Sequence, residues 1–444
     1  MFHSHIIILS IENIKGDYKV NDRSNDFHVS ANIKDHFEEL MRYGSVKSAL
    51  NFIKLNNEQT TMEQIELTQI PAPTFKEEER ANYFKNRFIE LGLSNVQVDH
   101  VGNVIGERIG KEDGPNLVVS AHLDTVFPEG TDVKAKIIDG KVYAPGIADD
   151  GRGLAALLTL IAALNDAEID TVANLIFVAT VGEEGLGDLR GVKYLFTHYD
   201  RIDGFISIEP GSPEKITYLA TGSRRYQVTY RGPGGHSFGD FGLPSAVHAL
   251  GRAIALIADL KTPIMPKTTF NVGTIKGGTS VNTIAQTAEM MIDLRSTSEH
   301  ELLQVEENVL SILYQVAELE NKRWGNKAVQ VEVKLVGERP AGSQSTDSVL
   351  VQAACAAANA LGFTPELDAP SSTDSNIAIS LGIPAVTLGG GGDFGGVHTL
   401  NEYFDSKDAY FGIQKILLTV LGLVGLHGYI NPLLHSVIKK GNHL

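Results

Sequence analysis

The sequence predicts an α/β fold with a mostly parallel sheet, into which a smaller α+β unit is inserted. Short, fully apolar runs alternate with helical segments over most of the chain, a pattern typical of strands buried on both faces of a sheet. In the middle of the chain, apolar and polar residues alternate strictly, which indicates a sheet with one face in water. A length of 444 residues allows two to three such units.

The N-terminal third of the chain is predicted to contain helices, after a stretch with weak periodicity and several charges. A helical pattern begins at Ser45 and ends before Pro71, and a second covers Glu77 to Leu91. Proline and glycine shortly beyond the last periodic residue are the usual signals that end a helix. We therefore interpret residues 1–45 as an N-terminal extension that precedes the folded units.

The buried sheet is predicted from apolar runs that are too short for helices. These runs cover residues 117–119, 175–178, 205–208 and 385–388. Between the first two runs, residues 154–164 are almost entirely alanine, leucine and isoleucine, which indicates a buried helix. The apolar stretch at residues 416–426 is shorter than the roughly 18 residues that span a bilayer, so we expect a buried final helix there.

The inserted unit is predicted between residues 215 and 340. Strand patterns cover residues 226–230, 290–294 and 329–335, and helical patterns cover residues 244–260 and about 300–319. This mixture differs from the flanking pattern and indicates a separate α+β unit. The predicted division of the chain is an extension (1–45), a first part of the α/β unit (46–214), the insert (215–340) and a second part (341–444).

Charge and cysteine content exclude several classes of partner. The chain has 38 lysine and arginine residues against 54 acidic residues, a formal net charge of −16. An acidic chain without a basic patch repels nucleic acid and anionic membranes, so neither is expected as a partner. The single cysteine, Cys355, excludes an intrachain disulfide and a cysteine-based zinc finger, and it fits a cytoplasmic location.

Histidine and carboxylate side chains stand where the predicted buried strands end. In an open α/β sheet, ligands bind outside the carboxyl ends of the strands, so these side chains are expected to share one site. They are His122 and Asp124 after the first strand, Asp149 in the turn before the apolar helix, Glu183 and Glu184 after the second strand, Glu209 at the end of the third and His398 behind the fourth.

The residue types indicate a site for two divalent metal ions. Two histidines, four or five carboxylates and no cysteine suit zinc or a similar ion. Two cations close together need an anionic bridge, which Asp149 could supply, and each ion then needs one histidine and one further carboxylate. Such a pair activates a water molecule and polarises a carbonyl group, while a spare carboxylate serves as general base.

Each motif alone has an ordinary structural interpretation. His122 at a strand end is most often only hydrogen-bonded, and Asp149-Asp150-Gly151 is typical of a turn followed by a helix cap. Glu183 and Glu184 are in most proteins a solvated pair. However, two glutamates directly after a buried strand are costly to place there without a cation. The motifs taken together therefore favour the metal site.

The motif set resembles a known family of dinuclear zinc metallopeptidases and deacylases. This family includes acetylornithine deacetylase, succinyl-diaminopimelate desuccinylase, glutamate carboxypeptidase, peptidase T and aminoacylase. The resemblance covers roughly residues 60–425. It is carried by His122-Leu123-Asp124-Thr125-Val126, Gly146-Ile147-Ala148-Asp149-Asp150, Gly182-Glu183-Glu184-Gly185, Glu209-Pro210, Gly234-Gly235-His236-Ser237 and His398-Thr399-Leu400-Asn401-Glu402.

The resemblance implies a role for each residue of the site. One metal ion would be held by His122 and Glu209, the other by Glu184 and His398, with Asp149 bridging both. The ions would be zinc, with cobalt or manganese as alternatives, and the Asp149–Asp150 peptide bond would be cis. Asp124 would orient His122, and Glu183 would be the general base that takes a proton from the attacking water.

The resemblance also implies a three-layer, zinc-exopeptidase-like catalytic domain and a ferredoxin-like lid and dimerisation domain. In a homodimer joined through the lids, His236 would reach the metal ions of the partner subunit and donate to the developing oxyanion. Asn282 and Arg295 match lid positions that bind substrate in relatives. The ordinary interpretations are a hydrogen-bonded turn for His236 and a salt bridge for Arg295. Arg224 and Arg225 have no assigned role and are expected to be solvated.

The predicted function is a metal-dependent hydrolase that cleaves amide bonds of short peptides, an exopeptidase of the di- or tripeptidase type. An N-acyl amino acid deacylase is the alternative, and a non-catalytic scaffold on the same fold is the alternative from another class. Glu209 leans toward carboxypeptidase or deacylase chemistry, because aminopeptidase-type members have aspartate there. The segment from Ile70 to Thr74 instead resembles peptidase T-like members, so aminopeptidase activity stays open.

Overall fold

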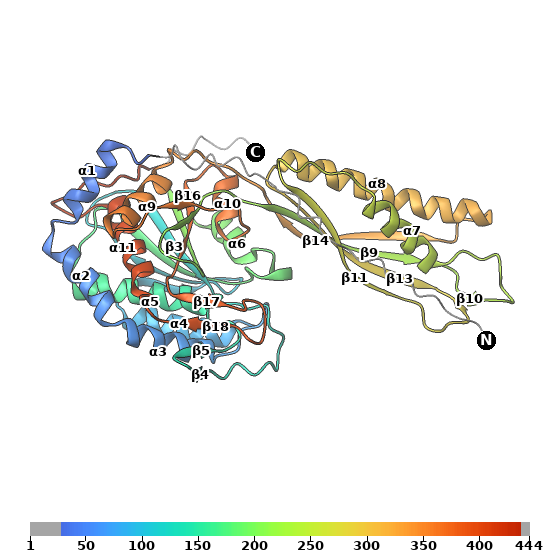
Figure 1. Cartoon of the computed structure of the whole chain (residues 1–444), viewed down its shortest axis with the longest axis horizontal. Coiled ribbons are helices and arrows are strands. Elements are labelled where there is room, and N and C mark those ends of the chain that lie inside the picture. Colours follow the sequence, from blue (N-terminus) through green and yellow to red (C-terminus); the bar gives the residue numbers. More distant parts are fainter. Residues whose placement is uncertain (1–27, 437–444) are drawn as a thin grey trace, which may run out of the picture.

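The computed structural model describes residues 28–436. Figure 1 shows a larger unit of helices around a sheet, from which a narrower unit extends to one side. No helix among the described residues is long and apolar enough to cross a membrane. The predicted combination of an α/β unit and an inserted α+β unit is confirmed.

The larger unit is built on a mixed sheet with a parallel centre. Within residues 28–436 this sheet has eight strands, in the order β1-β2-β6-β3-β7-β16-β8-β15. The four central strands are parallel and coincide with the four predicted apolar runs. The strands are β1 (Ser94–Val98), β2 (Val104–Arg108), β3 (Asn116–His122), β6 (Asn174–Thr180), β7 (Gly204–Glu209), β8 (Lys215–Thr217), β15 (Glu366–Leu367) and β16 (Ala385–Gly389).

Helices cover both faces of this sheet, so the larger unit has three layers. In β6, Leu175 and Phe177 belong to the core on one face, whereas Ile176 and Val178 belong to the core on the other. This explains the continuous apolar runs, since both sides of each strand are buried. One face carries α2 (Gly44–Leu55), α3 (Asn57–Thr68), α4 (Glu78–Glu90), α5 (Gly151–Asp166), α9 (Val349–Ala360) and α11 (Tyr410–Val424), and the other carries α6 (Arg190–His198) and α10 (Ser375–Ser380).

Part of the predicted N-terminal extension is integrated into this core. Residues 28–45 include α1 (Ala31–Leu40), whose Ile33, Phe37 and Leu40 are buried with the core of the larger unit. The Phe37 ring packs against Gly422 of α11, where even a Cβ atom would clash with it. The prediction that residues 28–45 precede the folded units is therefore wrong, because their weak periodicity gave no sign of this packed helix. Residues 1–27 of the predicted extension lie outside the described residues.

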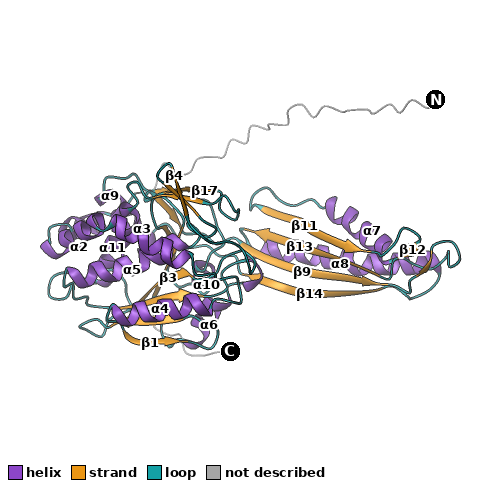
Figure 2. Cartoon of the chain, turned by 90° about the horizontal axis from the view of Figure 1, so that it is seen from below, coloured by secondary structure: helices purple, strands orange, loops and turns teal. Residues whose placement is uncertain are grey.

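The inserted unit is a ferredoxin-like sheet of antiparallel strands with helices on one face (Figure 2). Its strands lie in the order β11-β13-β9-β14, and the chain order is βαββαβ. β13 alternates buried and half-buried residues, as predicted for a sheet with one wet face. The elements are β9 (Gly222–Arg231), α7 (Ala246–Ala258), β11 (Thr268–Gly277), β13 (Thr287–Ser296), α8 (Glu299–Trp324) and β14 (Gln330–Arg339).

The chain passes from the larger unit into the inserted unit and back again through two segments that lie side by side. Ala220 and Gly342 exchange backbone hydrogen bonds of 2.9 and 3.2 Å, just before β9 and just after β14. This joint lies within a few residues of the predicted boundaries at 215 and 340. The root of the inserted unit thereby lies beside the carboxyl ends of β6 and β7, because Arg225 and Arg339 line one cavity with Glu184 and Glu209.

Smaller pairings complete the described fold. The strands β4 (Lys136–Ile138), β5 (Lys141–Tyr143), β17 (Asp393–Gly395) and β18 (Tyr403–Asp405) form a separate antiparallel sheet. The loop between β17 and β18 carries His398. At the far end of the inserted unit, β10 (Gly235–His236) pairs with β12 (Thr283–Ile284).

Candidate metal centre

The predicted ligands meet at the carboxyl edge of the central strands. His122 is the last residue of β3, Glu209 is the last residue of β7, and Glu184 follows β6 after a short turn. Asp149 lies two residues before the start of α5, and His398 comes from the β17–β18 loop. Because β6, β3 and β7 are parallel neighbours, their carboxyl ends lie at the same edge.

Asp149 lies between two groups, each made of one histidine and one carboxylate. Its Oδ1 atom is 2.9 Å from His122 Nε2, and its Oδ2 atom is 3.0 Å from His398 Nε2. His398 Nε2 is also 3.0 Å from Glu184 Oε1, and His122 Nε2 is 3.8 Å from Glu209 Oε2. This is the juxtaposition expected of a bridging carboxylate between two metal ions.

The donor set fits divalent ions. Ligand atoms of His122, Asp149 and Glu184, which the resemblance distributes over two neighbouring ions, all lie within 4.8 Å of one another, close enough for metal–ligand bonds of about 2.0–2.2 Å around Asp149. Hydrogen bonds with Asp149 and Glu184 raise the pKa of His398 to about 10. Although burial opposes it, the pKa of His122 is likewise raised by Asp124 and Asp149. The site thus concentrates negative charge that a bound cation would neutralise.

Asp124 holds both His122 and the glutamate loop in place. It is fully buried, and its carboxylate accepts hydrogen bonds from the backbone N–H groups of Glu183 (2.9 Å) and Glu184 (3.0 Å). Thr74 Oγ1 donates to the same carboxylate at 2.9 Å. His122 Nδ1 lies 2.9 Å from the backbone carbonyl of Asp124, an arrangement that directs Nε2 toward Asp149.

The loop that carries Asp149 is held by two further carboxylates. Glu402, which is fully buried, accepts the N–H groups of Ala148 (2.8 Å), Asp149 (3.0 Å) and Gly146 (3.1 Å). Asp150 accepts the N–H group of His122 and caps α5. The Asp149–Asp150 peptide bond is cis, as the resemblance implied. No role was predicted for Glu402; its position four residues after His398 was the available signal.

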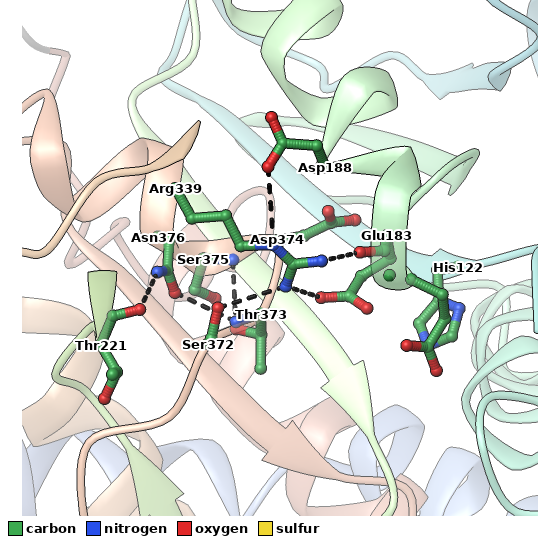
Figure 3. A network of polar contacts seen from close by, with 12 residues as sticks. His122, Glu183, Asp188, Thr221, Arg339, Ser372, Thr373, Asp374, Ser375 and Asn376 are labelled. Atoms are coloured by element: carbon green, nitrogen blue, oxygen red, sulfur yellow. Dashed lines mark hydrogen bonds and ion pairs between the residues drawn. The ribbon is translucent and has the colours of Figure 1, made fainter. Parts of the chain in front are cut away.

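Glu183 points into the site from beside Glu184 and contacts an arginine that sequence reasoning missed. Arg339 Nη1 donates to Glu183 Oε1 at 3.1 Å, and Nη2 donates to the carbonyl oxygen of Glu183 (Figure 3). Burial raises the pKa of Glu183 to about 8, although Arg339 opposes the shift. A carboxylate that titrates near neutral pH suits proton transfer.

A cavity of about 580 Å³ opens over these residues. Its other wall includes Arg225, Arg295 and Arg339 from the root of the inserted unit, together with Ser371, Ser372 and Thr373. Arg295 forms a salt bridge with Asp293 at 2.7 Å, as its ordinary interpretation predicts, and it also lines the cavity.

The expectation that Arg224 and Arg225 are solvated is wrong. Arg224 is 8% exposed and forms ion pairs with Glu299 at 2.9 Å and Glu338 at 2.7 Å. Arg225 lines the cavity and binds Asp293 at 3.1 Å. The acidic partners come from α8, β13 and β14, which are distant from Arg224 and Arg225 in the sequence. The residues next to the two arginines in the sequence therefore gave no indication of these ion pairs.

His236 and Asn282 are not brought to the metal centre within one chain. His236 belongs to β10, which lies at the end of the inserted unit away from β3 (Figure 1). It is exposed, and its Nδ1 accepts N–H groups of Phe238 and Gly239 at 3.2 and 3.1 Å. The carbonyl of Asn282 accepts the N–H group of Ser237, so the two predicted residues are neighbours.

Comparisons with known proteins agree with this geometry. A family model described as peptidase family M20/M25/M40 matches residues 118–421. The uncharacterized protein YqjE of Bacillus subtilis is 28% identical over 363 residues, 78% of this chain and 93% of that protein. Succinyl-diaminopimelate desuccinylase of Corynebacterium glutamicum is 24% identical over 336 residues, 73% of this chain and 86% of the enzyme. A tripeptidase structure from Staphylococcus aureus matches with a TM-score of 0.70 at 25% identity, covering 82% of this chain and 98% of that chain.

Proposed function

The chain belongs to peptidase family M20/M25/M40 and is a metal-dependent hydrolase of peptide or acyl amino acid amide bonds, and we propose that it is an exopeptidase that cleaves short peptides. The observation that carries this proposal is the position of Asp149. Its two carboxylate oxygens face the Nε2 atoms of His122 and His398 at 2.9 and 3.0 Å. A carboxylate held between two histidines in this way is suited to bridge two cations.

In this proposal, His122 and Glu209 hold one metal ion, Glu184 and His398 hold the other, and Asp149 bridges them. The ions are zinc, with cobalt or manganese as alternatives. Bound there, a pair of divalent ions would make water more acidic and polarise the scissile carbonyl group. Asp124 and Glu402 keep two of the ligands oriented, because they accept hydrogen bonds from the backbone N–H groups of Glu184 and Asp149.

Glu183 is proposed as the general base. Its carboxylate is buried beside Glu184 and lines the cavity above the ligands. From this position it would take a proton from the attacking water and pass it to the leaving amine.

We further propose a homodimer in which His236 serves the metal centre of the partner subunit. His236 is exposed within one chain, and glycines on its N-terminal side let the backbone approach another molecule closely. Beside a scissile carbonyl, its ring could donate a hydrogen bond to the developing oxyanion. Asn282, which contacts the same turn, would then meet substrate there, while Arg295 would meet it from within the chain.

Short peptides are the proposed substrates, and N-acyl amino acids are the alternative. The match to a tripeptidase structure, which covers 82% of this chain and 98% of that chain, supports peptides. The match to a desuccinylase supports a deacylase. Arg295 suits either class, because its guanidinium lines the cavity and can bind a substrate carboxylate with two parallel hydrogen bonds.

A hydrolysis screen tests the proposal. The purified chain meets a mixture of dipeptides, tripeptides and N-acyl amino acids with zinc, cobalt or manganese, and products are identified by mass spectrometry. We expect chelator-sensitive release of single amino acids from short peptides. Release of acyl groups alone would replace the peptidase by the deacylase. The absence of bound metal together with the absence of cleavage would contradict the metal site and favour a scaffold.

We also propose a cytoplasmic location. Cys355, the only cysteine of the sequence, is free and fully buried in α9. Proteins without disulfides are typical of reducing compartments. Cell fractionation would test this, and recovery of the enzyme outside the cytoplasmic fraction would contradict it.

A further inference from the structure

Arg339 stands at the joint between the inserted unit and the metal centre. It is the last residue of β14, the strand that leads the chain out of the inserted unit. Its side chain is only 4% exposed, although it reaches across the joint to the loop that follows β6. A buried guanidinium is costly unless its donors are satisfied, so its partners indicate what it does.

Those partners are Glu183, Asp188 in the loop that follows it, and Ser372 from the segment before α10 (Figure 3). Nη1 donates to Glu183 Oε1 at 3.1 Å and to Ser372 Oγ at 3.2 Å. Nη2 donates to the carbonyl oxygen of Glu183, and Nε lies 4.0 Å from Asp188 Oδ1. One rigid, planar group therefore contacts both the carboxylate and the backbone of the same residue.

The loop that carries Glu183 is thereby held from two sides. On the side of the central sheet, Asp124 accepts the N–H groups of Glu183 and Glu184. On the side of the inserted unit, Asp188 accepts the N–H group of Glu338 at 2.8 Å, next to the Arg339 contacts. With its backbone fixed at both ends, the loop leaves the Glu183 carboxylate few alternative positions.

We propose that Arg339 is a positioning residue that fixes the Glu183 carboxylate in its reactive orientation and ties it to the root of the inserted unit. This rests on the proposed function, in which Glu183 is the general base. A base must lie within hydrogen-bond reach of the proton that it removes. Arg339 meets this need because its planar guanidinium donates to the Glu183 carboxylate and to the Glu183 carbonyl oxygen at once. A lysine ammonium at the same place could not make both contacts.

Substrate binding is the competing role for an arginine at this place, and the contacts argue against it. Arg295 is 40% exposed, lines the cavity and binds only Asp293, through its Nε atom, an acidic residue that it shares with Arg225. Both Nη atoms of Arg339 are instead occupied by Glu183 and Ser372. Arg339 would have to release Glu183 before it could bind a substrate carboxylate.

The test compares Arg339→Met and Arg339→Lys with the unaltered enzyme on a short peptide. Arg339→Met should lower kcat about 100-fold, the cost of a small misplacement of a reacting group, while KM stays within about twofold. Bound metal, measured by elemental analysis, should be unchanged. Arg339→Lys should recover only part of kcat, because an ammonium group cannot contact the carboxylate and the carbonyl together.

Arg231→Met is the matched control. Arg231 lies on β9 of the same sheet and pairs with Glu332 at 3.5 Å, but both side chains are more than half exposed. Its removal deletes an arginine–carboxylate pair remote from the centre and should leave kcat unchanged.

A double variant tests whether Arg339 acts through Glu183. In a Glu183→Asp background the shorter carboxylate no longer reaches Arg339. Arg339→Met should therefore lower kcat by less than about threefold in that background.

Several outcomes would overturn the inference. A raised KM with an unchanged kcat would make Arg339 a substrate-binding residue, and an equal loss of kcat in the Glu183→Asp background would uncouple it from Glu183. If Arg339→Met does not fold, Ser372→Ala decides: a severalfold lower kcat at constant KM supports positioning, and no change refutes it. Full activity in Glu183→Gln would refute the proposed base itself, a failure distinct from that of Arg339.

Discussion

At the scale of single residues, the chemistry of the site depends on the direction in which the backbone points each side chain. Glu183 and Glu184 are neighbours in sequence, yet they have different surroundings. Glu184 faces His398, whereas Glu183 faces Arg339. Adjacent side chains of an extended segment point to opposite sides, so one can bind metal while the other moves protons.

Glu183→Gln should reduce kcat by about 10²–10⁴-fold, the usual contribution of a general base, without loss of bound metal. The amide fills the same space and can still accept a hydrogen bond from Arg339, but it cannot take a proton. Steady-state kinetics together with elemental analysis check this. A variant that loses metal as well as activity would mean that Glu183 is a ligand, and normal turnover would remove it from the mechanism.

Glu402→Gln should weaken metal binding by about 10–100-fold, the usual cost of losing support behind a ligand. The amide keeps one oxygen for the N–H groups of Ala148 and Asp149, but its NH2 group faces the N–H group of Gly146 in place of an acceptor. The turn that carries Asp149 would shift as a result. Competition with a metal-binding dye measures the affinity, and an unchanged value would show that the turn holds its shape without Glu402.

At the scale of elements, α11 shows how a buried helix can carry an ionisable group. Lys415 is fully buried, and its Nζ donates to the carbonyl oxygen of Lys215 at 2.6 Å. Burial lowers the pKa of Lys415 from 10.5 to about 7. Between these values the unfolded chain binds a proton that the folded chain does not, so folding stability gains with rising pH in this window.

Lys415→Met should therefore flatten the dependence of stability on pH. Relative to the variant, the unaltered protein should gain about 3.5 kcal/mol between pH 7 and pH 10, because the slope reaches about 1.4 kcal/mol for each pH unit in the middle of this range and is smaller at both ends. Urea unfolding at several pH values measures the difference. A constant difference between the two proteins across this range would mean that Lys415 stays charged in the folded state.

At the scale of the whole molecule, the separation of His236 from the metal centre matters most. The two groups occupy different units of the chain and lie apart in Figure 1. In the proposed twofold dimer, if one His236 reaches the centre of the other subunit, the second does the same in return, because such interfaces are reciprocal. His236→Ala should then lower kcat by about 10²–10³-fold, as for the loss of an oxyanion donor.

Complementation between subunits tests this arrangement directly. When His236→Ala and Glu183→Gln chains are co-expressed in equal amounts, mixed dimers contain one complete site. About a quarter of the unaltered rate should return if pairing is random. No recovery, or an active monomer in sedimentation, would contradict action across subunits, and co-expression of two differently tagged Glu183→Gln chains controls for contamination.

Local sequence determined the strands, the principal helices and the identity of the candidate ligands. A strand buried on both faces must be apolar along its whole length, so β3, β6, β7 and β16 were recognisable from a few consecutive residues. A histidine or carboxylate residue at the end of such a strand is easily recognised, because the residues before it are apolar. His122, Glu184 and Glu209 could therefore be grouped before any distance was known.

Only the tertiary structure decided the contacts between residues that are distant in the sequence. Arg339 lies 156 positions from Glu183, and Glu402 lies 253 positions from Asp149. Packing also integrated α1 into the core, although Ile33 and Phe37 are separated by charged residues. The spacing of residues in the sequence indicates which side chains share a face of one helix or strand. Which residues of another element they contact depends on how the elements pack. The ligand types thus follow from local sequence, and their orientation from the fold.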